Sequence, residues 1–259
     1  MDTISAKTAA ESDLAPFTII DGNPANGIIL LCDHAENKLP SRYGTLGLPP
    51  EGLARHIAWD PGAAAVAESV VERLGGDLVL QRYSRLAVDC NRSPELVDAI
   101  PERSEDTVIP NNAGLDAAAR ASRLDALWAP FHAALEQLLD RREDANLPTT
   151  LVTVHTFTPV YRGVARSLHV GIISTDDRRI ADPLLAALRR DTALIVGDNE
   201  PYSPKDNVDY TIRRHGRDRG LPHVMIEIRN DLVADAAGQR AWAERLAREL
   251  GGLEAARAA

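Results

Sequence analysis

The feature that most constrains the fold is a series of short apolar runs, each of which stops at polar residues. Residues 27–32 (GIILLC) stop at Asp33 and His34, and residues 150–154 (TLVTV) stop at His155. A continuous apolar run of this length is typical of a strand that is buried on both faces. The sequence therefore predicts strands that deliver polar side chains to their carboxyl ends.

Strand-like and helix-like segments alternate along the chain. Further strands are expected at residues 77–80, 86–88, 169–173, 192–197 and 224–229. Helical patterns occupy residues 57–74, 117–142, 180–190, 208–215 and 239–250. This alternation predicts an α/β fold with three α/β/α layers and a central mixed, largely parallel sheet. In such sheets, function collects at the carboxyl ends of the strands.

The chain is interpreted as a single domain over residues 1–259, with a loose leader at about residues 1–15. No linker rich in Gly, Ser or Pro and no internal repeat divides it. Residues 95–114 combine prolines, paired asparagines and a glycine, which suit a long surface loop and a candidate lid. Cys32 and Cys90 fall in apolar segments, which predicts buried free thiols and excludes a disulfide scaffold.

The net charge of the chain limits the kinds of partner that it is expected to bind. A net charge of -9, from 29 Lys and Arg against 38 Asp and Glu, gives no long-range attraction to nucleic acid or anionic lipid. No apolar run approaches the roughly 20 residues that span a bilayer, and the N-terminus lacks a signal-peptide pattern. We therefore expect a cytoplasmic protein with a small-molecule partner, and the sequence leaves its oligomeric state open.

Four predicted strands end in groups that can act on a polarised carbonyl. They are Asp33 with His34, Asn91 with Arg92, His155, and Glu227. A hydrolytic zinc site needs imidazole or carboxylate ligands that leave one position open for water. The metal then brings the pKa of that water towards neutrality and polarises the scissile carbonyl. The set indicates a zinc hydrolase.

The segments around these residues carry a more specific resemblance. Residues 33–40 (DHAENKLP), 56–63 (HIAWDPGA), 84–92 (SRLAVDCNR) and 154–157 (VHTF) resemble the signature segments of the N-formylglutamate amidohydrolase family. The similarity extends from about residue 27 to the C-terminal helix. Since the family is similar in fold to zinc carboxypeptidases and aspartoacylases, the resemblance implies a mixed sheet that holds one zinc ion per chain.

The carboxypeptidase pattern implies His34 and His155 as zinc ligands. In that pattern the second ligand is a glutamate three residues after the first histidine, where this chain has Asn37. A neutral amide is a poor zinc ligand. Glu36 is expected to take the role if the loop turns differently. Asp60 is another carboxylate that could serve as a metal ligand. Its position just before a helix, however, favours a role as the N-cap of that helix.

The same pattern implies Glu227 as the general base, which takes a proton from water and passes it to the leaving amine. It also implies Asn91 and Arg92 as a clamp for a substrate carboxylate. A guanidinium can grip a carboxylate with two parallel hydrogen bonds. Arg85 is a second candidate for substrate binding.

The polar region before the last strand carries two phenols and two cations. They are Tyr202, Lys205, Tyr210 and Arg213. A phenol or a cation there could steady a tetrahedral oxyanion. Tyr210 and Arg213 fall on one helical face, which makes Tyr210 a candidate for substrate binding. Solvation of surface side chains explains the pattern equally well.

Three functions are consistent with these patterns. The first is zinc-dependent hydrolysis of the amide bond of an N-acyl amino acid such as N-formylglutamate, giving formate and the amino acid. The second is hydrolysis of another N-acyl amino acid or of a peptide end, because a carboxylate clamp does not report the acyl group. The third is a metal-free binding protein on the same scaffold, which Asn37 favours. The sequence lacks a serine-nucleophile elbow and glycine-rich nucleotide loops, so rival enzyme classes have little support.

Overall fold

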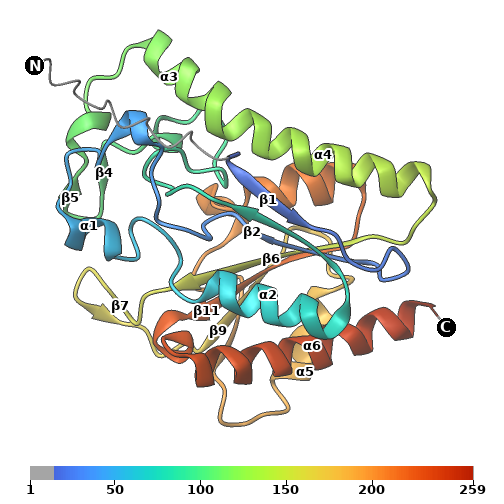
Figure 1. The fold of residues 1–259 in the computed structure, drawn as a ribbon. Coiled ribbons are helices and arrows are strands. Elements are labelled where there is room, and N and C mark those ends of the chain that lie inside the picture. Colours follow the sequence, from blue (N-terminus) through green and yellow to red (C-terminus); the bar gives the residue numbers. More distant parts are fainter. Residues whose placement is uncertain (1–14, 259) are drawn as a thin grey trace, which may run out of the picture.

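The computed structural model describes residues 15–258, which form three layers around a central sheet (Figure 1). In these residues the sheet has seven strands in the order β1-β3-β2-β6-β11-β9-β10. The strands are β1 (Phe17–Ile20), β2 (Ile28–Cys32), β3 (Asp77–Gln81), β6 (Thr150–Phe157), β9 (Val170–Ile173), β10 (Val196–Asp198) and β11 (His223–Arg229). Strands β3, β2, β6 and β11 are parallel to one another, while β1 and the β9-β10 pair run the opposite way. The predicted α/β fold with a mixed, largely parallel sheet is confirmed.

Helices cover both faces of the sheet. One face carries α2 (Ala63–Leu74), α5 (Ala181–Leu188) and α6 (Ala236–Ala258). The other carries α3 (Ala117–Arg123), a π-helical turn (Leu124–Trp128), α4 (Ala129–Asp144) and a second π-helical turn (Ile212–Gly216). Further short elements are α1 (Pro50–Ala54), the hairpin β4 (Arg103–Ser104) with β5 (Thr107–Val108), and the hairpin β7 (Val160–Tyr161) with β8 (Val164–Ala165).

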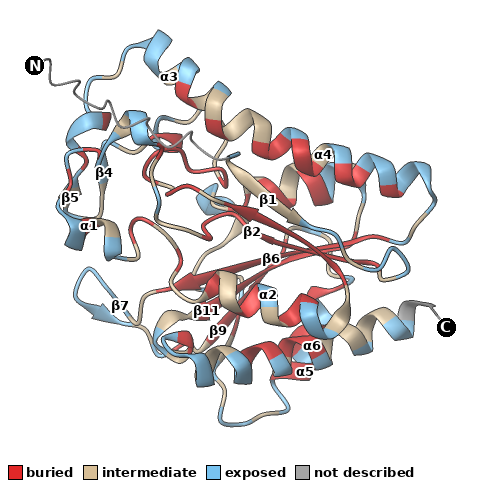
Figure 2. Ribbon diagram, viewed as in Figure 1, coloured by how far each residue is buried: buried red, intermediate tan, exposed pale blue. Residues whose placement is uncertain are grey.

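Strand β2 shows how the sequence fills both layers. All five of its residues are buried, and successive side chains point to opposite faces. Ile28, Leu30 and Cys32 belong to the core beneath α2, α5 and α6. Ile29 and Leu31 pack against α4 instead. The central strands are accordingly buried along their length, while the outer helix faces are exposed (Figure 2).

Several sequence-based boundaries differ from the structure. The strand predicted at residues 86–88 is wrong: this buried run forms a turn in which Ala87 N donates to Ser84 O. The helix predicted from residue 57 begins at Ala63. The helix predicted over residues 117–142 is confirmed as a helical stretch, interrupted by a π-helical turn just before Pro130, which has no N–H to donate. The predicted leader lies outside the described residues except for residue 15.

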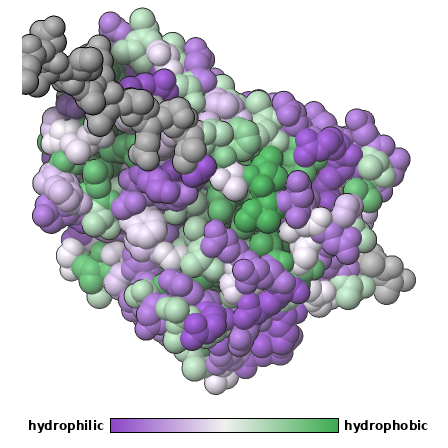
Figure 3. Space-filling model, in the orientation of Figure 1, coloured by the Kyte–Doolittle hydropathy of each residue, from purple (hydrophilic) through white to green (hydrophobic). Residues whose placement is uncertain are grey.

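The molecular surface over α6 is largely hydrophilic, and an apolar patch lies over the edge strand β1 (Figure 3). Ile20 in this strand is 43% exposed. Both Cys32 and Cys90 are buried free thiols, as predicted. Between residues 15 and 258, no helix is both long and apolar enough to pass through a bilayer.

Candidate metal centre

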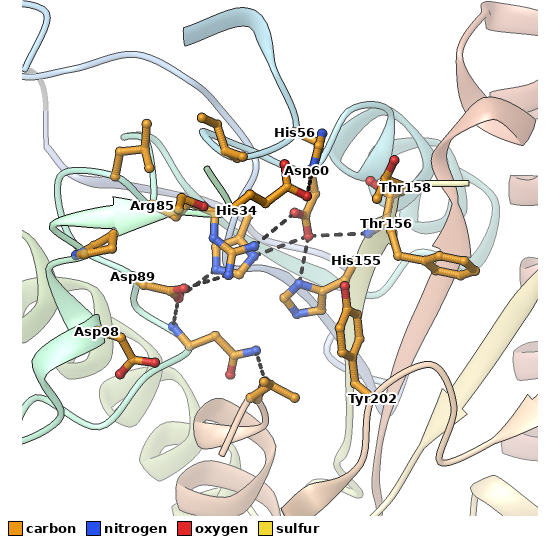
Figure 4. A pocket seen from close by; sticks show the side chains of 18 of the residues that line it. His34, His56, Asp60, Arg85, Asp89, Asp98, His155, Thr156, Thr158 and Tyr202 are labelled. Carbon is orange, nitrogen blue, oxygen red and sulfur yellow. Dashed lines mark hydrogen bonds and ion pairs between the residues drawn. The ribbon is translucent and has the colours of Figure 1, made fainter. Parts of the chain in front are cut away.

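Three buried side chains meet at the carboxyl edge of the sheet, and their donor atoms lie within 4.8 Å of one another. His34 follows β2, His155 lies in β6, and Asp60 lies in the loop before α2. The parallel strands β2 and β6 are neighbours, so residues at their carboxyl ends lie side by side. The group lines a cavity of about 340 Å³, which is the size of a small-molecule site (Figure 4).

Each histidine faces a carboxylate on both sides of its ring. Asp60 Oδ2 lies 3.2 Å from His34 Nδ1 and 2.9 Å from His155 Nδ1. His34 Nε2 lies 2.8 Å from Asp89 Oδ1, and His155 Nε2 lies 3.2 Å from Asp33 Oδ2. Because an ionised carboxylate can only accept, His34 Nε2 donates its proton to Asp89, and both ring nitrogens of His155 face carboxylates as donors. The two Nδ1 atoms converge on Asp60, and a metal ion held there would replace the protons that these nitrogens otherwise direct at the carboxylate.

The electrostatics of the group favour positive charge. Burial alone would lower the pKa of His155, but contacts with Asp33 and Asp60 outweigh it and raise this pKa to about 10. Burial opposes ionisation of Asp60 as well, yet His34 and His155 hold its pKa well below the usual range. The carboxylates are thus ionised and favour positive charge between them, from a protonated imidazole or from a bound cation.

The residues fit a divalent ion with nitrogen and oxygen ligands. Glu227 Oε2 is buried and has no hydrogen-bond partner within residues 15–258, while Asp33 Oδ2 and His155 Nε2 face each other at 3.2 Å as an ion pair without hydrogen-bond geometry. Buried polar atoms are normally satisfied, so the unpaired Glu227 oxygen beside this ion pair indicates a place for another group. Two imidazoles and one carboxylate are a donor set that zinc accepts.

Glu227 stands beside this group on the neighbouring strand. In the parallel pairing of β11 with β6, it lies directly opposite His155, so both side chains point to the same face of the sheet. Glu227 lines the cavity and is 5% exposed. Burial is the main cause that raises its pKa to about 7. A carboxyl group in this state can both accept and release a proton near neutral pH.

Asp60 is fixed by the backbone around it. Its N–H donates to His34 O at 2.9 Å, and Thr156 N donates to its Oδ2 at 3.3 Å. Gly62 is the N-cap residue of helix α2, and its left-handed φ of +85° and closeness to Val233 O leave no room for a Cβ. No side chain caps this helix among the described residues, so the prediction of Asp60 as its cap is wrong. The carboxylate faces the two imidazoles instead.

Glu36, which the sequence suggested as a ligand, lies outside the His34, Asp60 and His155 group. The chain turns after His34, and the Glu36 carboxylate pairs with Lys38 at 2.5 Å and Arg82 at 3.8 Å. Asn37 donates from Nδ2 to Leu53 O at 2.9 Å. The carboxylate of the group therefore comes from Asp60, far along the chain from His34.

Arg85 is tied to the carboxylates around the histidines. Its guanidinium contacts Asp89 Oδ2 at 2.7 Å and Asp60 Oδ1 at 3.4 Å. Arg85 lines the cavity, but its hydrogen-bonding edge faces these two residues. In this arrangement it stabilises the ionised aspartates that hold His34 in place.

Asn91, Arg92 and Tyr210 differ in how they relate to the cavity. Both Asn91 and Arg92 line it, although the Asn91 side chain is engaged with Val208 O at 2.7 Å and Thr211 N at 3.0 Å. Arg92 makes contacts of 3.3 Å from Nε to the exposed Asp98 and from Nη1 to Asn91 O. Tyr210 is not one of the residues that line the cavity. Its hydroxyl accepts from Arg214 Nη1 at 3.0 Å.

The candidate lid at residues 95–114 does lie at the cavity. Part of it forms the hairpin of β4 and β5, and Arg103, Ser104 and Glu105 line the cavity. Glu105 contacts His56 Nε2 at 3.1 Å and pairs with Arg55 at 2.9 Å. These contacts fasten the hairpin to the segment that follows α1.

The fold and the site define an α/β protein with a buried metal-competent group at the carboxyl edge of its sheet, which is an arrangement suited to a hydrolase. The model of the N-formylglutamate amidohydrolase family matches residues 26–234. The chain therefore belongs to the N-formylglutamate amidohydrolase family, as the sequence motifs indicated. The family points to N-formylglutamate amidohydrolase activity and to a small-molecule substrate.

Two solved structures show how closely the fold is shared. A gene product from Agrobacterium tumefaciens is 42% identical over 94% of this chain and 96% of its own, with a TM-score of 0.90. N-formylglutamate amidohydrolase from Ralstonia eutropha is 21% identical over 93% of this chain and 96% of its own, with a TM-score of 0.66. A comparison with curated proteins finds no match.

Proposed function

We propose that the protein is a zinc-dependent hydrolase of N-formylglutamate or a closely related N-acyl amino acid. His34, Asp60 and His155 would hold the ion, Glu227 would act as the general base, and Arg92 would bind a substrate carboxylate. The observation that carries this proposal is the buried Glu227 carboxylate, unpaired at Oε2 within residues 15–258, beside a buried His–Asp–His group in a small cavity.

The ion, when bound, supplies a Lewis acid that polarises the amide carbonyl and makes water easier to deprotonate. Glu227 takes a proton from the water that attacks the acyl carbon. The C–N bond then breaks, and Glu227 returns the proton to the leaving nitrogen. With N-formylglutamate the products are formate and glutamate, because the second proton of the water passes from the new formyl carboxyl group to the released amine.

Arg92 is the best candidate to orient the substrate among the predicted cationic residues. It lines the cavity, and its two closest acceptors, at 3.3 Å, are the exposed Asp98 and a backbone carbonyl. Exposed ion pairs contribute little, so a substrate carboxylate can compete for this guanidinium. The guanidinium of Arg85 is hydrogen-bonded to Asp60 and Asp89. These bonds support a role in positioning the two aspartates more than in binding substrate directly.

Two alternatives from the sequence remain relevant. Hydrolysis of a different N-acyl amino acid uses the same residues, and a screen of acyl groups separates it from deformylation. The metal-free binding protein drew its support from Asn37, whose amide is bonded to Leu53 O. Since Asp60 supplies a carboxylate beside the two histidines, this support is weak.

The decisive variant is Glu227→Gln, which keeps the size of the side chain and removes its proton chemistry. We expect about one zinc per chain and a loss of hydrolysis of roughly 1000-fold, because a general base contributes on the order of 100- to 10,000-fold. Glu244→Gln, on the exposed side of α6, is the matched control and should retain full turnover. Unchanged hydrolysis in Glu227→Gln would contradict the assignment.

A further inference from the structure

Tyr202 reaches the metal centre through a loop that crosses the sheet. His155, Glu227 and Gly171 lie next to one another on β6, β11 and β9. A Cβ at Gly171 would lie 1.9 Å from Glu200 O, so the loop backbone can rest on the sheet here only because this residue is a glycine. This close approach brings the chain over the sheet beside Glu227, two residues before Tyr202.

The Tyr202 side chain enters the same cavity as the metal centre. Tyr202 lines this cavity together with His155 and Glu227. Figure 4 shows its ring extending towards His155, with the hydroxyl at the inner end. Burial raises the pKa of the phenol, so the hydroxyl is protonated at neutral pH.

The hydrogen bonding of Tyr202 leaves its proton free. Arg166 Nη1 donates to the phenol oxygen at 3.4 Å. A guanidinium has no acceptor, so the phenol oxygen accepts this bond and its own O–H remains available. Within residues 15–258, no acceptor takes this O–H. A donor without a partner therefore stands in the cavity beside the proposed base.

Arg166 is held in place by aromatic faces. Its guanidinium carbon lies 5.6 Å from the ring centre of Phe157, 4.6 Å from that of Tyr161 and 5.4 Å from that of Tyr202. A cation over aromatic rings is attracted by their negative faces. The positive charge behind the phenol oxygen also makes the phenol proton a stronger donor.

We propose that Tyr202 donates a hydrogen bond to the carbonyl oxygen of the scissile amide as that oxygen gains negative charge, and that Arg166 positions the phenol. This inference rests on the proposed amide hydrolysis. Preorganised donors aimed at a developing oxyanion act most strongly in the transition state, and loss of one costs about 100- to 1000-fold in kcat. A phenol that bound only a ground-state carboxylate would instead act on KM.

The test compares Tyr202→Phe with wild type, both loaded with zinc, on N-formylglutamate. We expect kcat to fall by about 100-fold, with KM within about threefold of wild type and the zinc content unchanged. Tyr43→Phe is the control, because this ring packs under Arg42 and Arg123 outside the cavity. An unchanged kcat, or a loss confined to KM, would overturn the role.

A binding measurement separates this inference from the proposed function. In Tyr202→Phe, affinity for a tetrahedral phosphonate analogue of the reaction should weaken by the same factor as kcat/KM, while affinity for glutamate stays constant. Equal affinity of both proteins for the phosphonate contradicts the donor role even if turnover is too slow to measure. A wild-type protein that is inactive on every N-acyl amino acid contradicts the proposed function.

Arg166 provides a second, graded test. Arg166→Met removes the donor behind the phenol and should lower kcat by about 10-fold, which is less than the loss in Tyr202→Phe because the phenol itself remains. Arg166→Lys keeps a cation and should recover part of that loss. A loss in Arg166→Met that persists in the Tyr202→Phe background would show that Arg166 acts independently of the phenol.

Discussion

Two pairs of buried histidines in the described residues have similar spacing and opposite surroundings. The rings of His34 and His155 lie 5.0 Å apart, and those of His132 and His215 lie 5.1 Å apart. The first pair contacts Asp33, Asp60 and Asp89. The second pair bonds to itself at 2.8 Å, with a further contact of 2.9 Å from His132 to Cys90 O. The neighbouring carboxylates distinguish a candidate cation site from a structural pair.

The tautomers of the second pair follow from its contacts. A carbonyl oxygen only accepts, so His132 Nε2 carries the proton that faces Cys90 O. In the neutral ring, His132 Nδ1 then accepts from His215 Nε2. Burial lowers the pKa of His132 to about 4 and that of His215 to about 2. Burial alone thus expels charge from histidine, whereas the aspartates beside His155 reverse that effect.

The largest expected difference between the pairs is in metal binding. His155→Ala should lose its zinc and reduce hydrolysis at least about 1000-fold, because the ion loses a ligand and its orientation. His132→Ala should keep about one zinc per chain while melting at a lower temperature, because it opens a cavity in the core. Metal analysis and thermal melting of both variants check this. If His132→Ala folds but loses its zinc, the distinction between the proposed metal-binding pair and the structural pair is wrong.

The neutral pair should make stability depend on pH in a defined direction. Its folded pKa values lie below the ordinary 6.5, so the unfolded chain binds more protons between pH 6.5 and about 4 for His132, and down to about 2 for His215. The free energy of unfolding is therefore intact above pH 6.5 and falls as the pH is lowered through this window. For His132 alone the shift corresponds to about 3 kcal/mol.

Urea denaturation at pH 7, 6 and 5 measures this dependence. In a double variant with His132→Gln and His215→Gln, the titrating pair is gone, so its stability should approach that of wild type as the pH falls. A stability gap that stays constant from pH 7 to pH 5 would show that the pair is not held neutral.

A smaller effect is expected from the carboxylates behind the rings of His34 and His155. Asp33→Asn and Asp89→Asn keep the shape of the side chain but remove the charge that orients His155 and His34. Zinc affinity should weaken by about 10- to 100-fold in each variant. Competition with a chromophoric chelator measures it, with the exposed Asp218→Asn as control. Wild-type zinc affinity in both variants would show that Asp33 and Asp89 do not contribute to metal binding.

Much of the fold could be predicted because apolar runs and helical periodicity report burial directly. The runs before His34 and His155 form β2 and β6, and parallel strands bring their ends together. The strand prediction at residues 86–88 was wrong because a buried loop can have the same apolar composition as a buried strand. Edge strand β1 and the hairpin of β7 and β8 lack a continuous apolar run, and the sequence did not indicate them.

The site was less accessible to sequence reasoning because it depends on loops. Asp60 precedes a helix, where capping is the ordinary role, and only the fold of its loop turns it to the imidazoles. Glu36 is close to His34 in sequence, but the turn directs it to Lys38. Asp33 follows β2 as expected, whereas Asp89 follows a turn where a strand was predicted, and their pairing with particular ring nitrogens emerges only from three-dimensional contacts.

The most direct test of the central claim is an anomalous difference map from zinc-soaked crystals, recorded on both sides of the zinc absorption edge. The account predicts a peak about 2.0–2.2 Å from Nδ1 of His34, Nδ1 of His155 and Oδ2 of Asp60. Fully occupied zinc between His132 and His215, or at Glu36, with no density at Asp60, would contradict it.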